Sequence, residues 1–400
     1  MKRALIATTA ALVALSSGSA LAAQPETFVG DANAVGLELT IQGSGSIEGG
    51  GLTIGYSEAI VEESGEGAAA ERCAAEGAVS CAIAAGELAL GDTASSWWPG
   101  NAGTNSATAF ALPPDVSELL TAEIGEAVAT TAEAPRAIAE GGAAELTVTA
   151  TQTLYNALPQ ELRDGLEELT TTLEEQASSD PTDLIERAFA TTDQLRENIE
   201  SAPILQVYAG GSNSISEVDG DVTTSTAEAI GSTIVVAPFA DSTETNPQGL
   251  VIIEIGNATA TATSDQFQAA ADFSPAIVTL RVLNPATGEY DVQDVEGETA
   301  CPEPLVGTPL EVCVTAGSGS KTVDGSSAAA RADAVRVEAF PDTLAVSFRA
   351  ASAEVGVAST PTPAPPPEPE EPNMPRTGGG LMLPGLLLLG GALGLRRLKN

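Results

Sequence analysis

The feature that most constrains the fold is a period of two in the apolar positions. Val35, Leu37, Leu39 and Ile41 alternate with small or polar residues, a Gly-Ser stretch follows, and the alternation resumes over residues 52–56. Successive side chains of a β-strand point to opposite faces, so this pattern predicts a β-hairpin. Short apolar runs predict further strands at residues 146–150, 204–208, 234–237, 250–255, 276–283 and 344–348.

A strand–loop–strand unit recurs along the chain. Residues 37–42, 205–208 and 310–316 each lead into a Gly/Ser stretch. A tetrad of a small residue, an acid, Ala and an aliphatic residue then follows at 57–60, 227–230 and 332–335. The last two copies also share Val-Asp-Gly, at 218–220 and 323–325. Because small inward residues let facing sheets approach, we predict an antiparallel, sandwich-like β body with repeated hairpin units.

The region 114–200 has a different period. Apolar residues there recur every three or four positions, which predicts amphipathic helices, and Pro159 and Asp180-Pro181 stand where two of them would begin. The apolar faces of three helices are predicted to consist of Leu119, Leu120, Ile124 and Val128, then Leu162, Leu166, Leu169 and Leu173, then Leu184, Ala188, Leu195 and Ile199. This helical insertion separates β-rich regions at 24–113 and 201–358. It either packs on the β body or protrudes to meet a partner.

The first 23 residues have the layout of a secretory signal peptide. Lys2 and Arg3 precede an apolar run over 4–15, and Ala20-Leu21-Ala22 provides an Ala-x-Ala exit. The apolar run is shorter than the roughly 20 residues that span a bilayer, so we favour cleavage over a retained anchor. The mature chain is then expected to begin near Gln24.

The other end of the chain has three parts in order. Residues 359–373 are rich in Pro and Glu, which predicts an extended stalk. An uncharged apolar segment over 379–395 is followed by Arg396, Arg397 and Lys399, and this predicts a membrane helix with its basic end inside the cell. Between stalk and helix stands a short motif of five residues: Met374, Pro375, Arg376, Thr377 and Gly378.

This C-terminal layout resembles the LPXTG-type cell-wall-anchored proteins of Gram-positive bacteria, and the general style is similar to that of surface proteins of high-GC Gram-positive bacteria. The resemblance implies that a sortase cuts between Thr377 and Gly378 and joins Thr377 to a cell-wall amine. Met374 stands where the family has Leu. The alternative is a membrane helix that is never cut, and under either interpretation the body is extracellular.

Four cysteines, Cys73, Cys81, Cys301 and Cys313, are predicted to form disulfides, because an even count at short spacings in an exported protein is typical of disulfide bonds. Three pairings satisfy the count. We favour the two local ones, Cys73–Cys81 and Cys301–Cys313, each of which would add roughly 2–3 kcal/mol in the chain-entropy model.

Composition excludes several functions. The chain has 55 acidic and 16 basic residues, and a body this acidic repels nucleic acid. It contains no His, so serine triads and zinc–His sites are absent. We predict no cofactor and no bound metal. The acidic body would instead attract a basic partner or divalent cations, or it reflects adaptation to salt.

Two neighbouring indoles, Trp97 and Trp98, are the candidate ligand contacts, because stacked aromatic rings suit sugars or a protein groove; the alternative is that both belong to the core. No pair of carboxylates stands out by spacing as a glycosidase pair. The prediction is therefore a non-enzymatic surface protein with a structural or adhesive role, whose partners are the sortase, the wall amine and an unidentified glycan or protein. The alternatives are a wall-attached polysaccharide hydrolase and a cation- or glycan-binding module.

Overall fold

The computed structural model describes residues 27–41, 50–87, 92–107, 120–133, 135–149, 160–179, 182–197, 202–265, 267–297, 299–302, 310–340 and 345–360. The chain divides into two compact units, Met1–Thr362 and Pro363–Asn400, and all described residues belong to the first. The predicted signal peptide, the GSGS stretch after Ile41, the predicted sorting-type motif and the apolar segment 379–395 lie outside the described residues. No helix among the residues described is long and apolar enough to cross a membrane.

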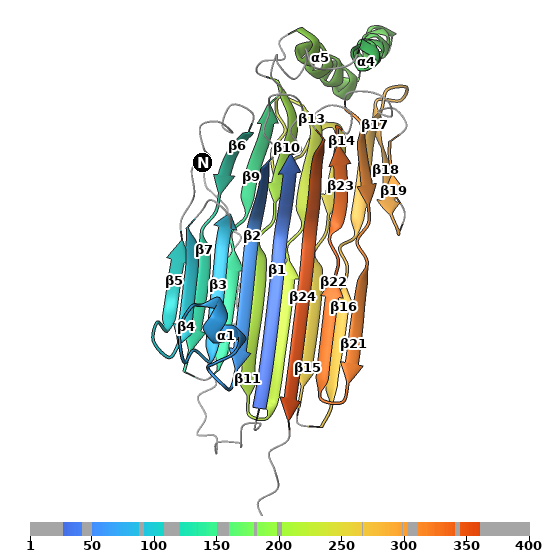
Figure 1. The fold of residues 1–400 in the computed structure, drawn as a ribbon. Coiled ribbons are helices and arrows are strands. Elements are labelled where there is room, and N and C mark those ends of the chain that lie inside the picture. The colour runs from blue at the N-terminus through green and yellow to red at the C-terminus, as the bar shows by residue number, and fades with distance from the viewer. Residues whose placement is uncertain are drawn as a thin grey trace, which may run out of the picture. The chain divides into compact units, whose positions relative to one another are not determined.

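The first unit is mainly β and consists of three antiparallel sheets (Figure 1). We call the ten-stranded sheet the front sheet. Its strands are β1 (Thr27–Ile41), β2 (Gly50–Glu62), β3 (Ser80–Glu87), β4 (Thr93–Trp98), β19 (Thr299–Ala300), β20 (Val312–Thr315), β21 (Gly319–Asp324), β22 (Ser327–Ala332), β23 (Val335–Ala339) and β24 (Val346–Thr360).

Two seven-stranded sheets form the other layer. The upper back sheet contains β6 (Leu120–Ile124), β9 (Ala144–Thr149), β10 (Pro203–Ala209), β13 (Ser232–Pro238), β14 (Gly249–Ile255), β17 (Val278–Asn284) and β18 (Glu289–Val295). The lower back sheet contains β5 (Gly103–Ala107), β7 (Ala127–Ala132), β8 (Arg136–Gly141), β11 (Ser212–Asp219), β12 (Val222–Ala229), β15 (Ala258–Ser264) and β16 (Ala269–Ser274).

The two halves of this sandwich have different cores. Between the front sheet and the upper back sheet lie large aliphatic side chains such as Leu37, Leu146 and Ile253. Between the front sheet and the lower back sheet the inward residues are mainly Ala and Ser, and Cα atoms of facing strands lie within 8 Å of each other. Sheets packed face to face are ordinarily about 10 Å apart, so the lower half is unusually thin, as the small alternating residues predicted.

Hydroxyl groups bridge the thin half. Ser216 Oγ of β11 donates to the Ala59 carbonyl of β2 at 2.9 Å, and Ser214 Oγ donates to the Ser57 carbonyl at 3.1 Å. A serine side chain reaches the backbone of the opposite layer only when the two layers are very close. These bonds also satisfy polar groups that would be costly to bury alone.

At one level of the sandwich the strands switch which of their residues, odd- or even-numbered, point inward. We call this level the waist. It includes Gly36, Gly55, Gly141 and Gly210. Along each half, inward positions follow every second residue, but across the waist they stand three apart. The eight buried pairs that show this are Ala34/Leu37, Ile54/Ser57, Ile124/Ala127, Ala209/Ser212, Ala229/Ser232, Ile255/Ala258, Ala332/Val335 and Ala350/Ala353. The extra residue acts as a β-bulge does, since it turns the rest of the strand to its other face.

Glycine is required at the waist because the backbones of the two layers touch there. A Cβ added to Gly36 would lie 2.2 Å from the Gly210 carbonyl oxygen, and one added to Gly141 would lie 2.5 Å from the Gly55 carbonyl carbon. Gly55 also has φ +62°, which disfavours any residue with a side chain.

The second and third copies of the predicted repeat take the same form in opposite layers. The strands β10, β11, β12 and β13 make one kinked hairpin, and β20, β21, β22 and β23 make the other. Gly220 and Gly325, at φ +65° and +60°, stand in the two equivalent turns. The first copy differs, since its strands β1 and β2 cross the waist without interruption.

The predicted helical insertion over 114–200 is correct only in its second part. Helices α4 (Gln160–Ser179) and α5 (Asp183–Glu197) bury Leu173, Ile185 and Leu195 in the main core, the large hydrophobic cluster that also contains Leu37, Leu146 and Ile253. Arg187 Nη1 of α5 lies 2.8 Å from Asp241 Oδ2. The insertion therefore packs on the β body. The earlier helix predicted through Leu120, Ile124 and Val128 is wrong, because those residues belong to β6 and β7. Leu120 and Ile124 are four residues apart, a spacing that both a helix face and a strand face allow.

Replacing Gly36 with Ala should destabilise the fold by about 2–4 kcal/mol, because the new methyl group collides with the backbone of the other layer. The measurement is the free energy of unfolding from urea denaturation. Gly356→Ala on β24 is the matched control, since a Cβ there meets nothing within 4 Å, and it should be close to neutral. Equal effects of the two substitutions would contradict backbone contact at the waist.

Candidate functional site

A group of carboxylates gathers on the outward face of the front sheet, where β1, β2 and β24 lie side by side. Asn33 on β1 is opposite Glu58 on one side and Glu354 on the other. Asp31 lies two residues along β1 and so faces the same way. We call Asp31, Asn33, Tyr56, Glu58 and Glu354 the acidic hollow.

The phase change at the waist is what turns these residues outward. Tyr56 and Glu58 follow Ile54 on β2 by two and four residues, so strict alternation would point all three to the same side. Ile54 points into the core between the front sheet and the upper back sheet. Without the extra step between Ile54 and Ser57, alternation would place Glu58 inside the sandwich. Instead Ser57 and Ala59 point inward and Glu58 faces the outer surface.

Glu58 is fixed by two partners although only 4% of its side chain is exposed. Tyr56 Oη donates to Glu58 Oε2 at 2.7 Å, and Arg72 Nε lies 3.0 Å from Glu58 Oε1. Charge-assisted bonds of this kind offset much of the cost of burying a carboxylate.

Arg72 comes from a cap, residues 63–79, that folds over the outward face of β2 and β3. The cap contains the short helix α1 (Ala68–Arg72), whose Ala69 packs against Ile60 and Cys81. The Cys73–Cys81 disulfide joins the cap to β3, and the Gly67 amide donates to Glu62 Oε1 at 3.0 Å. The cap is therefore held at both ends and positions Arg72 beside the acidic hollow.

The pKa of Asp31 is raised to about 6. Burial is the main cause, followed by the negative charges of Glu58 and Glu354, while the charge of Arg72 acts in the opposite direction. The residue opposite Asp31 on β24 is Gly356, which has no side chain, and an added Cβ there would meet nothing within 4 Å. A carboxyl group that holds its proton near pH 6 next to an arginine-paired carboxylate is the arrangement that general acid–base chemistry uses.

The structure does not bring the predicted contacts Trp97 and Trp98 into this hollow. Trp97 shares a cross-strand row with Cys81, Ile60 and Asp31, which puts it three strand spacings, roughly 14 Å, from Asp31. The cap covers the positions between them. Trp98, the next residue on β4, faces the other side of the sheet, and both indoles are half-buried.

Both local disulfides are confirmed. Cys73 and Cys81 have a Cα–Cα distance of 5.9 Å, Cys301 and Cys313 one of 4.3 Å, and no cysteine is free. Among the described residues no group of three or more His, Cys, Asp or Glu side chains is arranged to hold a metal ion. The residues of the sorting-type motif, Met374 to Gly378, lie outside the described part of the chain.

No protein family and no curated protein sequence matches this chain. Among solved structures it shows a distant likeness to OmpT, expressed in the outer membrane of Vibrio cholerae, with 7% identity over 83% of this chain and 97% of that one and a TM-score of 0.20. The translocator domain of the autotransporter NalP from Neisseria meningitidis gives 11% identity, 83% and 88% coverage and a TM-score of 0.16. At these TM-scores the likeness carries no argument.

Replacing Asp31 with Asn should change how stability depends on pH. The folded state holds the Asp31 proton more tightly than the unfolded chain does, since the pKa is about 6 when folded and near 3.8 otherwise. The stabilisation from this group is therefore complete below about pH 4 and is lost as the pH rises through 6. We expect Asp31→Asn to be more stable than the parent at pH 7.5 and to lose less stability between pH 4 and 7.5.

The measurement for Asp31→Asn is the melting temperature at half-unit steps from pH 4 to pH 8. Glu140→Gln, which removes an exposed carboxylate on β8, is the control and should follow the parent curve. Parallel curves for Asp31→Asn and the parent would show that Asp31 does not titrate in this way.

Proposed function

We propose that the chain is an exported protein, tethered to the cell envelope, with a non-enzymatic structural or adhesive role outside the cell. The observation that carries this proposal is the pair of local disulfides, Cys73–Cys81 and Cys301–Cys313. Disulfides form and persist in oxidising surroundings, and outside hyperthermophiles they are rare in the cytosol. The disulfides are consistent with the secretory signal predicted over residues 1–23.

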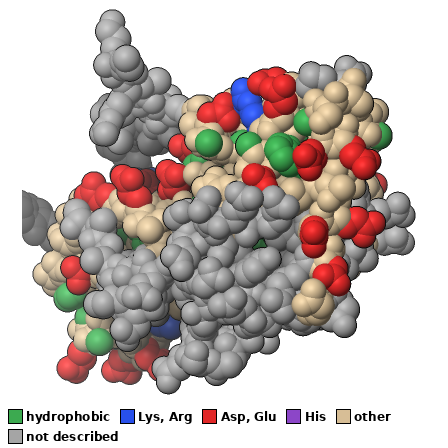
Figure 2. All heavy atoms as spheres, turned by 90° about the horizontal axis from the view of Figure 1, so that it is seen from above, with side chains coloured by type: hydrophobic (Ala, Val, Ile, Leu, Met, Phe, Trp, Pro, Cys, Tyr) green, Lys and Arg blue, Asp and Glu red, His purple; other side chains and the backbone are tan. Residues whose placement is uncertain are grey.

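The surface of the described unit is strongly acidic. Figure 2 shows Asp and Glu side chains spread over the end viewed, with few Lys or Arg. Lys321 is the one lysine between the predicted signal peptide and the predicted stalk. A large net negative charge keeps a protein soluble and repels anionic lipid and nucleic acid.

The position of β24 suits a tether. The stalk was predicted over 359–373, but Ser359 and Thr360 still belong to β24 and pair with β1. The strand is held on one side by β1 and on the other by β22 and β23. Force applied along β24 would load two ladders of backbone hydrogen bonds together rather than one after another. A central strand at this place fits a protein that transmits load between the envelope and a partner.

We infer that the tail ends in one of two ways. In the LPXTG-like alternative a sortase joins Thr377 to a cell-wall amine. In the other, the apolar segment 379–395 stays in the membrane as a helix with Arg396 and Arg397 inside. Both leave the described unit outside the cell.

Mass spectrometry of envelope fractions distinguishes these alternatives. Sorting predicts a C-terminal peptide that ends at Thr377 and carries wall material, released only by wall hydrolases. A retained helix predicts a membrane fraction whose C-terminal peptides include the intact 396–400 terminus. A cytosolic protein with Met1 still joined to Gln24 through the uncut leader would contradict export.

The acidic hollow favours a second candidate, a wall-attached polysaccharide hydrolase that uses carboxylates. Asp31 would donate a proton to the glycosidic oxygen, and Glu58, held by Arg72 and Tyr56, would act as the second carboxylate. In this alternative Gly356 would leave room for a sugar beside Asp31.

This second candidate is tested by incubating the purified chain with wall polysaccharide and measuring new reducing ends. A hydrolase predicts turnover near pH 5–6 that falls by roughly a hundredfold or more in Asp31→Asn, with Glu140→Gln as the unaffected control. Absence of turnover in the parent, or equal turnover in Asp31→Asn, would remove the hydrolase and leave the non-enzymatic role.

A further inference from the structure

At one edge of the sandwich, the described strands of the front sheet and of the upper back sheet are not paired with each other. The last strand of the upper back sheet is β18, and within the described chain it pairs only with β17. The nearest strand of the front sheet, β19, has two residues, and β20 is its one partner among the strands that the structure describes. The outer edge of β18 is therefore a row of backbone donors and acceptors of the kind that can accept another strand.

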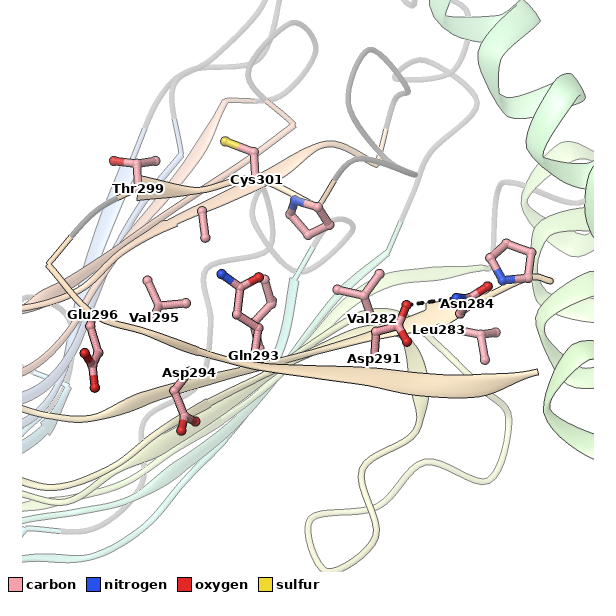
Figure 3. A pocket seen from close by; sticks show the side chains of 14 residues that line it. Val282, Leu283, Asn284, Asp291, Gln293, Asp294, Val295, Glu296, Thr299 and Cys301 are labelled. Carbon is pink, nitrogen blue, oxygen red and sulfur yellow. Dashed lines mark hydrogen bonds between the residues drawn. The ribbon is translucent and has the colours of Figure 1, made fainter. Parts of the chain in front are cut away.

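A cavity of about 840 Å³ lies between these edge strands (Figure 3). Thr299 and Cys301 lie on one side of it, and Gln293 and Val295 lie on the other. Its apolar wall includes Leu280 and Val295, which are also part of the main core. Cavities of this size that combine an apolar wall with a few polar groups are typical binding sites.

The charge beside the cavity has one sign. Residues 289–296 include four carboxylates and no basic residue. Asp291, Asp294 and Glu296 belong to the lining of the cavity, and the side chain of Asp294 lies on the outer face of the sheet beside Thr279. No Lys or Arg is among the described lining residues. Asn284 Nδ2 donates to Asp291 Oδ2 at 2.9 Å, and Thr279 Oγ1 donates to Asp294 Oδ1 at 2.8 Å, which orients both carboxylates.

The basic residue of β17, Arg281, contacts other groups and not the carboxylates of the cavity. Arg281 alternates with the inward Leu280 and Val282, so it faces the outside of the sheet. Its Nη1 lies 3.2 Å from Glu254 Oε1, and its guanidinium carbon lies 4.9 Å from the centre of the Tyr290 ring. It does not neutralise the acidic side of the cavity.

We propose that the β18 edge and its cavity bind an extended, Lys- or Arg-rich segment of a partner protein, which adds to the upper back sheet as a further strand. Alternate residues of that segment would face the cavity beside Asp291 and the apolar wall. The others would lie on the outside beside Asp294 and the exposed Val292. The inference holds wherever the protein is located, so it stands apart from the proposed envelope tether.

Charge decides against a second copy of this chain as the occupant. Pairing of β18 with β18 would set four carboxylates against four, and like charges opposite each other destabilise a sheet. Edge carboxylates also prevent aggregation in many proteins. That role alone needs no cavity and no apolar wall, whereas strand addition uses both.

The experiment measures binding of fluorescently labelled nine-residue peptides to the purified full chain by anisotropy in 0.15 M NaCl. The probes are an alternating Lys-Val peptide, an alternating Glu-Val peptide and an alternating Lys-Pro peptide. The Lys-Pro peptide keeps the charge but lacks half of the backbone donors that a strand needs. We expect binding of Lys-Val, at least tenfold weaker binding of Lys-Pro, and none of Glu-Val.

Two charge variants locate the site. Asp291→Asn/Asp294→Asn/Glu296→Gln should weaken Lys-Val binding by roughly tenfold, which is the effect of losing three exposed ion pairs. Glu123→Gln/Glu140→Gln/Glu338→Gln removes the same charge from other exposed strand positions and should bind as the parent does. Circular dichroism melting checks that both variants fold.

Three results would overturn the proposal. The first is no binding of Lys-Val by the folded parent. The second is equal binding of Lys-Val and Lys-Pro, which would mean attraction to the overall charge of −39 rather than strand addition. The third is equal weakening by the two triple variants, which would place the binding elsewhere on the surface.

Discussion

The contact of the two backbone layers at the waist is the constraint on which the other features depend. Gly36 and Gly141 approach the opposite layer so closely that no side chain fits between them. Below this level the layers stay close, and the inward positions are mainly Ala and Ser. Above it they separate, and Leu, Ile and Val fill the space. One level of glycine thus joins two cores of different thickness within continuous strands.

The waist also determines which residues of β1 and β2 face the outer surface. Since the inward phase changes between Ile54 and Ser57, the polar residues of β1 and β2 below the waist face outward and form the acidic hollow. The cap and the Cys73–Cys81 disulfide then place Arg72 against Glu58. A carboxylate that alternation alone would bury inside the sandwich becomes part of a half-buried surface site.

Much of this fold could be predicted from residue patterns, and the failures have identifiable causes. Alternation around Leu37 and Ile54 predicted the first hairpin, and short cysteine spacings favoured the correct disulfides. The helix through Leu120 and Ile124 was wrong because a spacing of four fits both helix and strand. The acidic hollow was not predicted, since Asp31 and Glu354 stand 323 residues apart (354 − 31) and meet Glu58 only through strand pairing. The phase change that turns them outward leaves no mark in the sequence except scattered glycines.

Oxidation of all four cysteines in the cell tests the proposal of an exported, disulfide-stabilised surface protein most directly. The protein would be taken from its native cells without reductant, unfolded in the presence of an alkylating reagent and digested for mass spectrometry. The account predicts no alkylated cysteine and two linked peptides, Cys73–Cys81 and Cys301–Cys313. Four alkylated cysteines would show a reduced protein and would contradict both the disulfides and the proposed location.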